Sequence, residues 1–438
     1  MQLSEKEIIK AISPIEVIKP GNRLFSYFWF DSRQMKKNGL FFALKGKRDG
    51  HDFIGDAFKN GASAAVVEKK VGEFPCFMVK NTLESLGKAA EYTIRNCSSI
   101  RIGITGSAGK TTTKEFLYHF ISSEYSTEKT PGNWNNLIGV PVFLLNRNPS
   151  SEALIIEMGI SEPGEMDKLV EIAKPKIALI TRIYPTHTEF LSNIEGVKRE
   201  KEGILRHAET GVFNLDDPNQ SSLWKNFKGK KIFYSISREA DVNLISWKRI
   251  SNTSLSLEIF WKGKELSGVF SFWSPVFIEN LLASLAVASA VMNKTPDFRK
   301  LEPLDGRGKT WEKDGVLFID ESYNSNPSSL LRSLISLQEL EGTKIAVLAD
   351  MLELRNPEEE HRRTGKLISD LKIHRLIFVG PLMKFAAEEA SKKRDGVFWV
   401  KSAEEVSKKL QEFLKPGSIV FFKGSHSTGL WKEAEKWM

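Results

Sequence analysis

The stretch RIGITGSAGKTTTKEF, residues 101–116, decides the fold of this 438-residue chain. An apolar run typical of a buried β-strand enters a glycine-containing turn, and Gly109, Lys110 and Thr111 open a helix-like segment. Backbone N–H groups of such a turn, together with the helix N-terminus, bind phosphate oxygens. Lys110 would reach the β- and γ-phosphates, and the Thr111 hydroxyl would bind Mg²⁺. The sequence therefore predicts a phosphate-binding loop (P-loop) for a nucleoside triphosphate, with Ile104 where the general pattern has glycine.

The composition is that of a soluble globular protein, with 41% hydrophobic and 27% charged residues. The length predicts two or three domains. Cys76 and Cys97 are the two cysteines, so neither a disulfide framework nor a cysteine metal site is expected. The charged N-terminus does not resemble a signal peptide. The most apolar stretch, residues 281–292, is too short to cross a bilayer. We therefore expect a cytoplasmic protein with no transmembrane segment.

The net charge of +8 raises the question of a polyanionic partner. The lysines are interleaved with acidic residues, and no basic stripe with aromatic residues stands out. We therefore expect no nucleic-acid partner. A phosphorylated substrate would account for the charge, and so would ordinary solvated lysine faces.

Three blocks organise the chain, and we predict domains at residues 1–97, 98–303 and 304–438. The second block alternates strands and helices until residues 231–273, where the short runs IFYSIS, VNLISWKRI, LSLEIFW and GVFSFW are typical of an antiparallel patch. The third block alternates strand and helix again. The predicted class is α/β: a small α/β domain, a central P-loop domain with a mostly parallel sheet plus the antiparallel patch, and a Rossmann-like C-terminal domain.

Polar residues follow many of the predicted strands in the second and third blocks. They are Glu157, His187, Asp216, Asp217, Asp320, Asp350 and Lys423. In open parallel sheets, ligands bind beyond the carboxyl ends of the strands. Because such ends occur in both blocks, the sequence predicts catalysis in a cleft between two domains.

Some of these residues suggest a specific chemistry. Glu157 is placed to hold Mg²⁺ directly or through water. Asp320 could accept hydrogen bonds from two ribose hydroxyls, and Arg307 lies between two glycines and suits a phosphate or carboxylate. A flexible linker is the alternative for Arg307, and a structural role is the alternative for His187.

Two other features are less decisive from the residues alone. Asn133, Asn135 and Asn136 could line a ligand loop or could serve turn geometry. Lys201 by itself indicates only a lysine on a helix surface.

Taken in order, these motifs resemble the Mur ligases of peptidoglycan synthesis over nearly the whole chain. The first block contributes DSRQMKKNGLFFALKGKRDGHDF at 31–53 and NGASAAVV at 60–67. The second contributes TGSAGKTTTKE, TPGNWNNLIGVP, EMG and the region around His187. The third contributes GRG, DESYNSNPSS, VLADMLEL, His361 and FFKGS. SYNSNP is the most specific of these and resembles the branch of the family that adds D-alanyl-D-alanine.

The resemblance implies roles residue by residue. ATP would be bound by Gly106, Ser107, Gly109, Lys110, Thr111, Thr112, Asn280, Arg307 and Asp320. Mg²⁺ would be held by Thr111, Glu157, His187 and Lys201, the last as a carbamate formed with CO₂. Lys110, His187 and Lys201 would be the catalytic residues. The UDP moiety would contact Ser32, Arg33, Asp49, Gly50, His51 and Asp52, and the other substrate contacts would be Asn133, Asn136, Tyr323, Asn324 and Asn326.

The resemblance also implies a reaction. ATP would activate the terminal carboxylate of UDP-MurNAc-tripeptide as an acyl phosphate, and the amine of D-alanyl-D-alanine would attack it, giving UDP-MurNAc-pentapeptide. We expect ATP and Mg²⁺ as cofactors and a monomeric enzyme, and other cell-wall synthesis proteins stay open as partners. A sister ligase that adds another amino acid is one alternative, and a non-catalytic ATP-binding scaffold is another.

The chain differs from the family pattern at several positions. Arg182 and Tyr184 replace an asparagine and a glycine, Val276 and Phe277 replace a His-Asn pair, Glu202 and Gly203 invert the usual order, and His426 replaces an arginine. The changes at 182, 276 and 277 motivate the scaffold alternative. The P-loop, Glu157, His187, Lys201, Arg307 and Asp320 are all present, so the sequence predicts an active enzyme.

Overall fold

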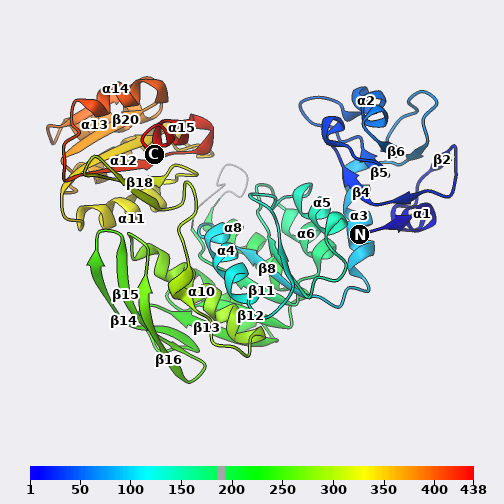
Figure 1. Ribbon diagram of the computed structural model, residues 1–438, viewed down its shortest axis with the longest axis horizontal. Coiled ribbons are helices and arrows are strands. Elements are labelled where there is room, and N and C mark those ends of the chain that lie inside the picture. Colours follow the sequence, from blue (N-terminus) through cyan, green and yellow to red (C-terminus); the bar gives the residue numbers. More distant parts are fainter. Residues whose placement is uncertain (185–192) are drawn as a thin grey trace.

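The computed structural model describes residues 1–184 and 193–438. Three large sheets follow one another along the described chain, built from residues 16–78, 100–270 and 309–423. The first and third parts lie at opposite ends of the central part (Figure 1). The α/β class is confirmed. The boundaries predicted at 97/98 and 303/304 fall between the sheets, and the division into domains stays a prediction.

The first part contains a mostly parallel sheet and a small antiparallel pair. The sheet order is β2 (Glu16–Ile18), β7 (Cys76–Met78), β6 (Ala62–Val67), β5 (Gly39–Phe42) and β4 (Tyr27–Trp29), and β1 (Leu3–Ser4) pairs with β3 (Leu24–Phe25). Only the β2–β7 pair is antiparallel in this sheet, as far as the described residues go. Its helices are α1 (Glu5–Ile12), α2 (Ile54–Lys59) and α3 (Thr82–Ile94). Helix α3 also contacts helices of the central part and joins the two.

The central sheet runs through nine described strands. Their order is β16 (Lys264–Phe270), β15 (Ser254–Trp261), β14 (Val242–Ser251), β13 (Lys230–Ser235), β12 (Thr210–Asn214), β11 (Ile177–Ile180), β8 (Ile100–Thr105), β10 (Ala153–Glu157) and β9 (Thr127–Lys129). Strand β15 pairs antiparallel with both β14 and β16, as predicted for this patch. The run IFYSIS is not part of that patch, because β13 is parallel to both β12 and β14. The crossover through α9 (Ser221–Asn226) returns the chain to the same edge and makes β13 parallel.

Helices cover both faces of the central sheet (Figure 1). One face packs against α4 (Lys110–Ile121) and α10 (Val276–Val291), with Ile102, Ile104 and Phe116 in its core. The other packs against α5 (Gly139–Asn146), α6 (Glu165–Ala173) and α8 (Ile194–Glu202), with Leu154 and Ile156 in its core. The alternation of strand residues between two cores follows from the period-two geometry of a strand. Because both faces of these strands are buried, nearly every residue in them is apolar, which gives continuous apolar runs in the sequence.

The third part is a six-stranded sheet with one antiparallel edge. Its order is β17 (Lys309–Lys313), β18 (Val316–Glu321), β22 (Ser418–Lys423), β19 (Thr343–Ala349), β20 (Arg375–Val379) and β21 (Val397–Val400). Its helices are α11 (Pro327–Gln338), α12 (Pro357–Ile368), α13 (Met383–Ser391), α14 (Val406–Gln411) and α15 (Leu430–Glu435). Strand β22 pairs with both β18 and β19, so the latest strand of this sheet in the chain lies in its middle.

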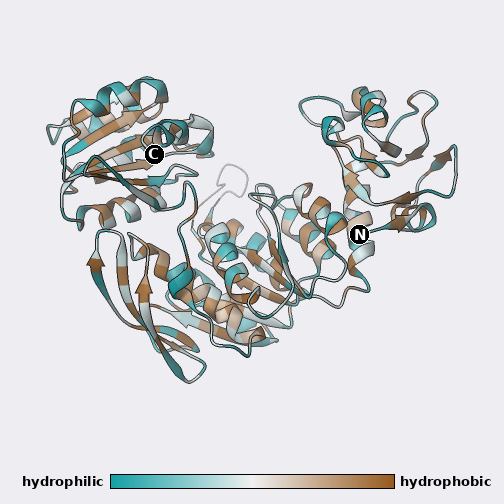
Figure 2. Cartoon of the chain, in the orientation of Figure 1, coloured by the Kyte–Doolittle hydropathy of each residue, from teal (hydrophilic) through white to brown (hydrophobic). Residues whose placement is uncertain are grey.

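Apolar residues concentrate in the strands and on the inner faces of helices (Figure 2). Within residues 1–184 and 193–438, no helix has the length and apolar character that a membrane crossing requires.

Candidate active site

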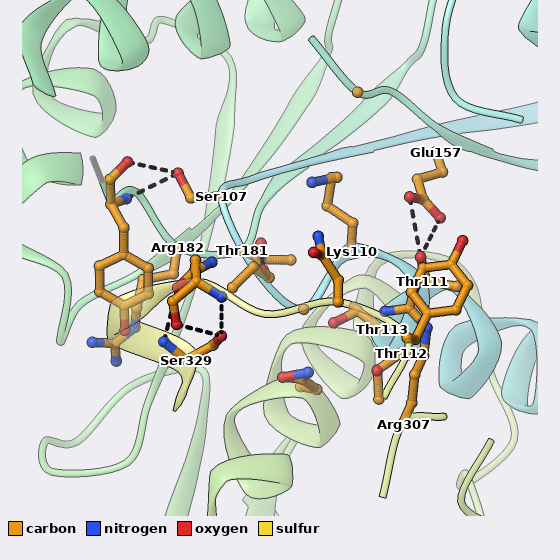
Figure 3. A pocket seen from close by; sticks show the side chains of 18 of the residues that line it. Ser107, Lys110, Thr111, Thr112, Thr113, Glu157, Thr181, Arg182, Arg307 and Ser329 are labelled. Carbon is orange, nitrogen blue, oxygen red and sulfur yellow. Dashed lines mark hydrogen bonds between the residues drawn. The ribbon is translucent and has the colours of Figure 1, made fainter. Parts of the chain in front are cut away.

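A cavity of about 480 Å³ lies where the central and third parts meet. Thirteen of the predicted site residues line it: Ser107, Gly109, Lys110, Thr111, Thr112, Asn133, Asn136, Glu157, Asn280, Arg307, Tyr323, Asn324 and Asn326. They come from strand ends, helix starts and loops of both parts (Figure 3). The carboxyl edges of two parallel sheets thus supply one cavity, as expected of open α/β sheets.

The P-loop connects β8 to α4 through two glycines in unusual conformations. Gly106 has φ 150°, and a Cβ there would lie 1.9 Å from the Thr181 hydroxyl oxygen. Gly109 has φ 81°, and a Cβ there would lie 2.9 Å from the Asn280 side-chain nitrogen. The first approach leaves no room for a side chain at 106. The second places the amide of Asn280 directly against the start of α4.

Lys110 begins α4 and bends back over the loop. Its Nζ donates to the Gly106 carbonyl oxygen at 2.8 Å. Burial lowers the pKa of Lys110 from its usual value, and the nearby Glu157 carboxylate partly opposes that effect. An ammonium group held at the mouth of a ring of backbone N–H groups can neutralise phosphate charge.

Glu157 ends β10 and faces Thr111 across the loop (Figure 3). The Thr111 hydroxyl donates to its carboxylate, with oxygen–oxygen distances of 2.9 and 3.1 Å. Asn135 donates from Nδ2 at 2.9 Å, and Lys114 Nζ lies 3.2 Å from Oε2. Burial would raise the pKa of Glu157, but the charges of Lys114 and Lys110 outweigh it and lower the pKa overall.

The Glu157 carboxylate and the Thr111 hydroxyl are suitable ligands for a magnesium ion. Both offer hard oxygen ligands, which Mg²⁺ prefers. Among the described residues, no group of three or more His, Cys, Asp or Glu side chains is arranged to hold a metal by itself. A metal here would therefore need phosphate oxygens or water in addition. His187, a predicted ligand, lies outside the described residues.

Lys201, near the end of α8, is buried rather than on a helix surface. Its Nζ donates to the same Gly106 carbonyl oxygen that accepts from Lys110, at 3.2 Å. Burial and the neighbouring Lys110 charge lower the pKa of Lys201 well below its usual value. A larger fraction of this amine is thus uncharged near neutral pH than for an exposed lysine.

The third part contributes Arg307 to the cavity that the P-loop residues line (Figure 3). Its guanidinium lies 3.8 Å from the ring centre of Tyr323. Burial lowers the pKa of Arg307. Asp320 does not line the cavity, because its carboxylate accepts from the backbone N–H groups of Gly306 and Ser322 at 3.1 and 2.9 Å. Burial raises the pKa of Asp320. In this arrangement Asp320 shapes the turn that carries Arg307.

The SYNSNP segment connects β18 to α11 and borders the cavity. Asn326 caps α11 by accepting from the Ser329 N–H at 2.8 Å. Lys423, at the end of β22, donates to the Asn324 carbonyl oxygen at 3.2 Å and pairs with Glu321 at 3.0 Å. The segment is therefore held at both ends, and its residues 323–326 line the cavity.

The six predicted residues of the first part do not line this cavity. They are Ser32, Arg33, Asp49, Gly50, His51 and Asp52. Arg33 is exposed and pairs with Asp31 at 2.7 Å. His51 is buried, and both of its ring nitrogens are engaged, with Asp49 at 2.5 Å and with the Glu68 N–H at 2.9 Å. These residues form a separate candidate site.

Sequence reasoning missed several charged residues at or near the cavity, among them Lys114, Glu279 and Arg332. Lys114 is fully buried in α4, and its Nζ also donates to the carbonyl oxygens of Thr130 and Gly132. One signal was available for it, because Leu117 and Ile121 follow Lys114 at helical spacing and place it on an apolar face of α4. Glu279 carries a similar signal, because it is the charged residue of the mostly apolar helix α10, whereas no such signal marked Arg332.

Comparison with known families places these features in context. The Mur ligase middle domain matches residues 104–288, the "Mur ligase, glutamate ligase domain" matches residues 306–426, and the "Mur ligase family, catalytic domain" matches residues 29–84. The UDP-N-acetylmuramoyl-tripeptide--D-alanyl-D-alanine ligase of Bacillus subtilis strain 168 is 30% identical over 416 residues, which cover 91% of this chain and 90% of the relative. The Escherichia coli K12 protein of the same name is 30% identical over 365 residues, or 80% of each chain.

Solved structures agree with the sequence relatives. A crystal structure of MurF from Acinetobacter baumannii superposes with a TM-score of 0.91 at 25% identity and covers 100% of this chain and 99% of that one. MurF from Thermotoga maritima in complex with ADP has a TM-score of 0.83 at 30% identity and covers 94% and 98%. Since the matched domains span most of the chain and the relatives match along nearly their whole length, this protein belongs to the Mur ligase family.

Proposed function

We propose that the protein is an ATP-dependent ligase that joins D-alanyl-D-alanine to UDP-MurNAc-tripeptide. The observation that carries this proposal is the cavity in which the P-loop of the central part meets the SYNSNP segment of the third part. A phosphate-binding loop opposite a polar, charge-lined segment suits a reaction in which phosphate activates one substrate while another attacks. The names of the B. subtilis and E. coli relatives support the same substrates.

The reaction follows from the charge of its substrates. A carboxylate is a poor acyl donor, because its leaving group would be an oxide. An oxygen of the tripeptide's terminal carboxylate therefore attacks the γ-phosphorus of ATP. ADP departs, and an acyl phosphate forms. The amine of D-alanyl-D-alanine then attacks the acyl carbon. Inorganic phosphate leaves, and the amine loses a proton to give the amide.

The residues at the P-loop would serve the first step. Lys110 and the loop N–H groups would bind the phosphates, and Arg307 would add positive charge from the third part. Thr111 and Glu157 would hold Mg²⁺, which would neutralise phosphate charge when bound. Because the cavity lies between two parts of the chain, docking of the third part would also exclude water from the acyl phosphate.

Lys201 and His187 complete the proposed set. A lysine can form a carbamate only as the uncharged amine, which attacks the carbon of CO₂ and releases a proton. The burial of Lys201 and its lowered pKa favour that form. We propose Lys201 as a carbamylated residue and His187 as a metal ligand.

The separate site of the first part is proposed to hold the UDP moiety. Its residues are those at 32–33 and 49–52, far along the chain from the P-loop. A cytoplasmic location and a monomeric state remain predictions, to be checked by fractionation and by light scattering.

Phosphate release from Mg-ATP tests the proposal. The purified protein would be assayed with UDP-MurNAc-tripeptide alone, with D-alanyl-D-alanine alone and with both, beside Lys110→Ala. We expect release only with both substrates, a UDP-pentapeptide product by mass spectrometry, and loss in the variant. Replacing D-alanyl-D-alanine by single amino acids would reveal a sister ligase. ATP binding without release in any mixture would contradict catalysis and favour the scaffold alternative.

A further inference from the structure

A charged cluster joins the third part to residues 182–184, the segment that hydrogen-bonds to Ser107 of the P-loop. We call this segment the rim of the P-loop. Its centre is Glu279, on α10, whose side chain is 8% exposed. Arg182 Nε donates to Oε1 at 2.6 Å, and Arg332 Nη2 donates to Oε2 at 3.0 Å. Asn214 Nδ2 donates to Oε1 at 2.9 Å. One buried carboxylate therefore accepts from two guanidinium groups and an amide.

Arg332 connects different parts of the chain within this cluster. It lies on α11 of the third part, whereas Glu279 and Tyr184 belong to the central part. Its Nη1 donates to the Tyr184 hydroxyl at 2.9 Å while its Nη2 binds Glu279. The planar guanidinium can bind two acceptors at once, which a lysine ammonium on a flexible stem does less well.

The segment that Arg332 contacts is bonded directly to the P-loop. The Ser107 N–H donates to the Arg182 carbonyl oxygen at 2.7 Å. The Ser107 hydroxyl donates to the Tyr184 carbonyl oxygen at 2.9 Å, and the Tyr184 N–H lies 2.9 Å from the same hydroxyl oxygen (Figure 3). The position of Ser107 thus depends on a segment whose side chains are fixed, through the cluster, to α11.

The other end of the connection is the SYNSNP segment. Helix α11 begins at Pro327, directly after the capping residue Asn326. Arg332 lies within two turns of that cap. Any displacement of α11 therefore moves both the polar segment at the far side of the cavity and the guanidinium that restrains the P-loop rim. Arg182 and Tyr184, which depart from the family pattern, are both members of this connection.

We propose that Arg332 is a positioning residue that couples docking of the third part to nucleotide binding, by bridging Glu279 and Tyr184 at the rim of the P-loop. Arg307 of the third part lines the same cavity as the P-loop, so it would contact the nucleotide when the third part is docked. If the bridge is removed, a smaller fraction of molecules has the third part docked, and the apparent nucleotide affinity falls by that fraction. The coupling to the dipeptide side rests on the proposed function, whereas the coupling to nucleotide does not.

Calorimetric titration with Mg-ADP tests the proposal without turnover. The proteins are the parent, Arg332→Met, Tyr184→Phe and the double variant. Arg332→Met is expected to weaken Mg-ADP binding about tenfold, and Tyr184→Phe about threefold. The double variant should bind no more weakly than Arg332→Met, since both changes break one connection.

Arg362→Met is the matched control. Arg362 has the same exposed fraction as Arg332, 32%, and pairs with Glu358, Glu388 and Glu389, so all of its ion-pair partners lie within the third part. It should alter thermal stability to a similar extent and leave Mg-ADP affinity unchanged. Arg332→Met with parental affinity, an equal loss in Arg362→Met, or an additive double variant would overturn the proposal. Tyr184→Phe, which removes one hydroxyl, keeps the test valid if Arg332→Met fails to fold.

The same proteins separate this inference from the proposed function. A parent protein that binds Mg-ADP but releases no phosphate with both substrates would contradict the ligase assignment. The affinity differences among the variants would still decide the coupling. If turnover is present, the KM for ATP should rise in Arg332→Met and stay unchanged in Arg362→Met.

Discussion

Replacing Lys114 by methionine would remove the buried ammonium group that pairs with Glu157 at 3.2 Å. Lys114 is 0% exposed and Glu157 is 2% exposed. The change removes the ammonium partner of three groups: the Glu157 carboxylate at 3.2 Å and the carbonyl oxygens of Thr130 and Gly132 at 2.9 and 2.7 Å. Removing one member of a buried ion pair costs about 3–5 kcal/mol. Because Glu157 keeps the hydroxyl of Thr111 and the amide of Asn135, we expect the lower end, about 3 kcal/mol.

Differential scanning calorimetry without ligands measures this loss. In a folding unit of about 150–250 residues, such as the central part, a loss of 1 kcal/mol lowers the melting temperature by about 2–4 °C. The expected decrease for Lys114→Met is therefore about 6–12 °C. The double variant Lys114→Met/Glu157→Gln should recover part of it, because it no longer buries an unpaired charge. Lys129→Met is the control, since the ion pair of Lys129 with Glu115 is partly exposed and its loss should cost about 1 kcal/mol or less. A loss below about 1 kcal/mol in Lys114→Met, or no recovery in the double variant, would refute the reasoning.

Three further changes give measurable outcomes. Gly106→Ala should abolish Mg-ADP binding in titration calorimetry, because its Cβ would lie 1.9 Å from the Thr181 hydroxyl oxygen; retained affinity would contradict the geometry. His361 is buried and its lowered pKa is caused mainly by burial, so the folded state favours the neutral ring. Its contribution is present above the unfolded pKa of about 6.5 and is lost as pH falls towards the folded pKa, so His361→Gln should flatten the decline in unfolding free energy between about pH 7.5 and 5.5. With ¹³C-labelled bicarbonate, NMR should detect a carbamate that is absent in Lys201→Arg, and equal spectra would exclude it.

The P-loop could be predicted because its residues form one short motif. The meeting of the strand ends could be predicted because parallel strands end at a common edge of their sheet. The glycines, Lys110 and Thr111 lie within a few residues of one another, so one turn fixes their relation. The carboxyl ends of parallel strands share one edge of a sheet, so Glu157 could be placed beside the loop without knowing the tertiary structure.

What could not be predicted depends on non-local geometry. The direction of β13 is set by the crossover through α9, and alternation in its own residues carries no sign of that. Burial decides the character of Lys201, but its helix reads IEGVKREKE, so the surrounding charged residues gave no sign that this lysine faces inward. The partners of Arg332 lie 53 and 148 residues away along the chain and meet it only where two parts dock.

The strand order of the third part has a consequence for synthesis of the protein on the ribosome. Strand β22 separates β18 from β19, although residues 418–423 are made after every other strand of that sheet. While these residues are still inside the exit tunnel, β19, β20 and β21 have no central strand to join them to β17 and β18. The first two parts can fold during translation, whereas the third must wait. A nascent chain could therefore assemble its P-loop early, yet Arg307 and the SYNSNP segment would be held in place only after the last strand emerges.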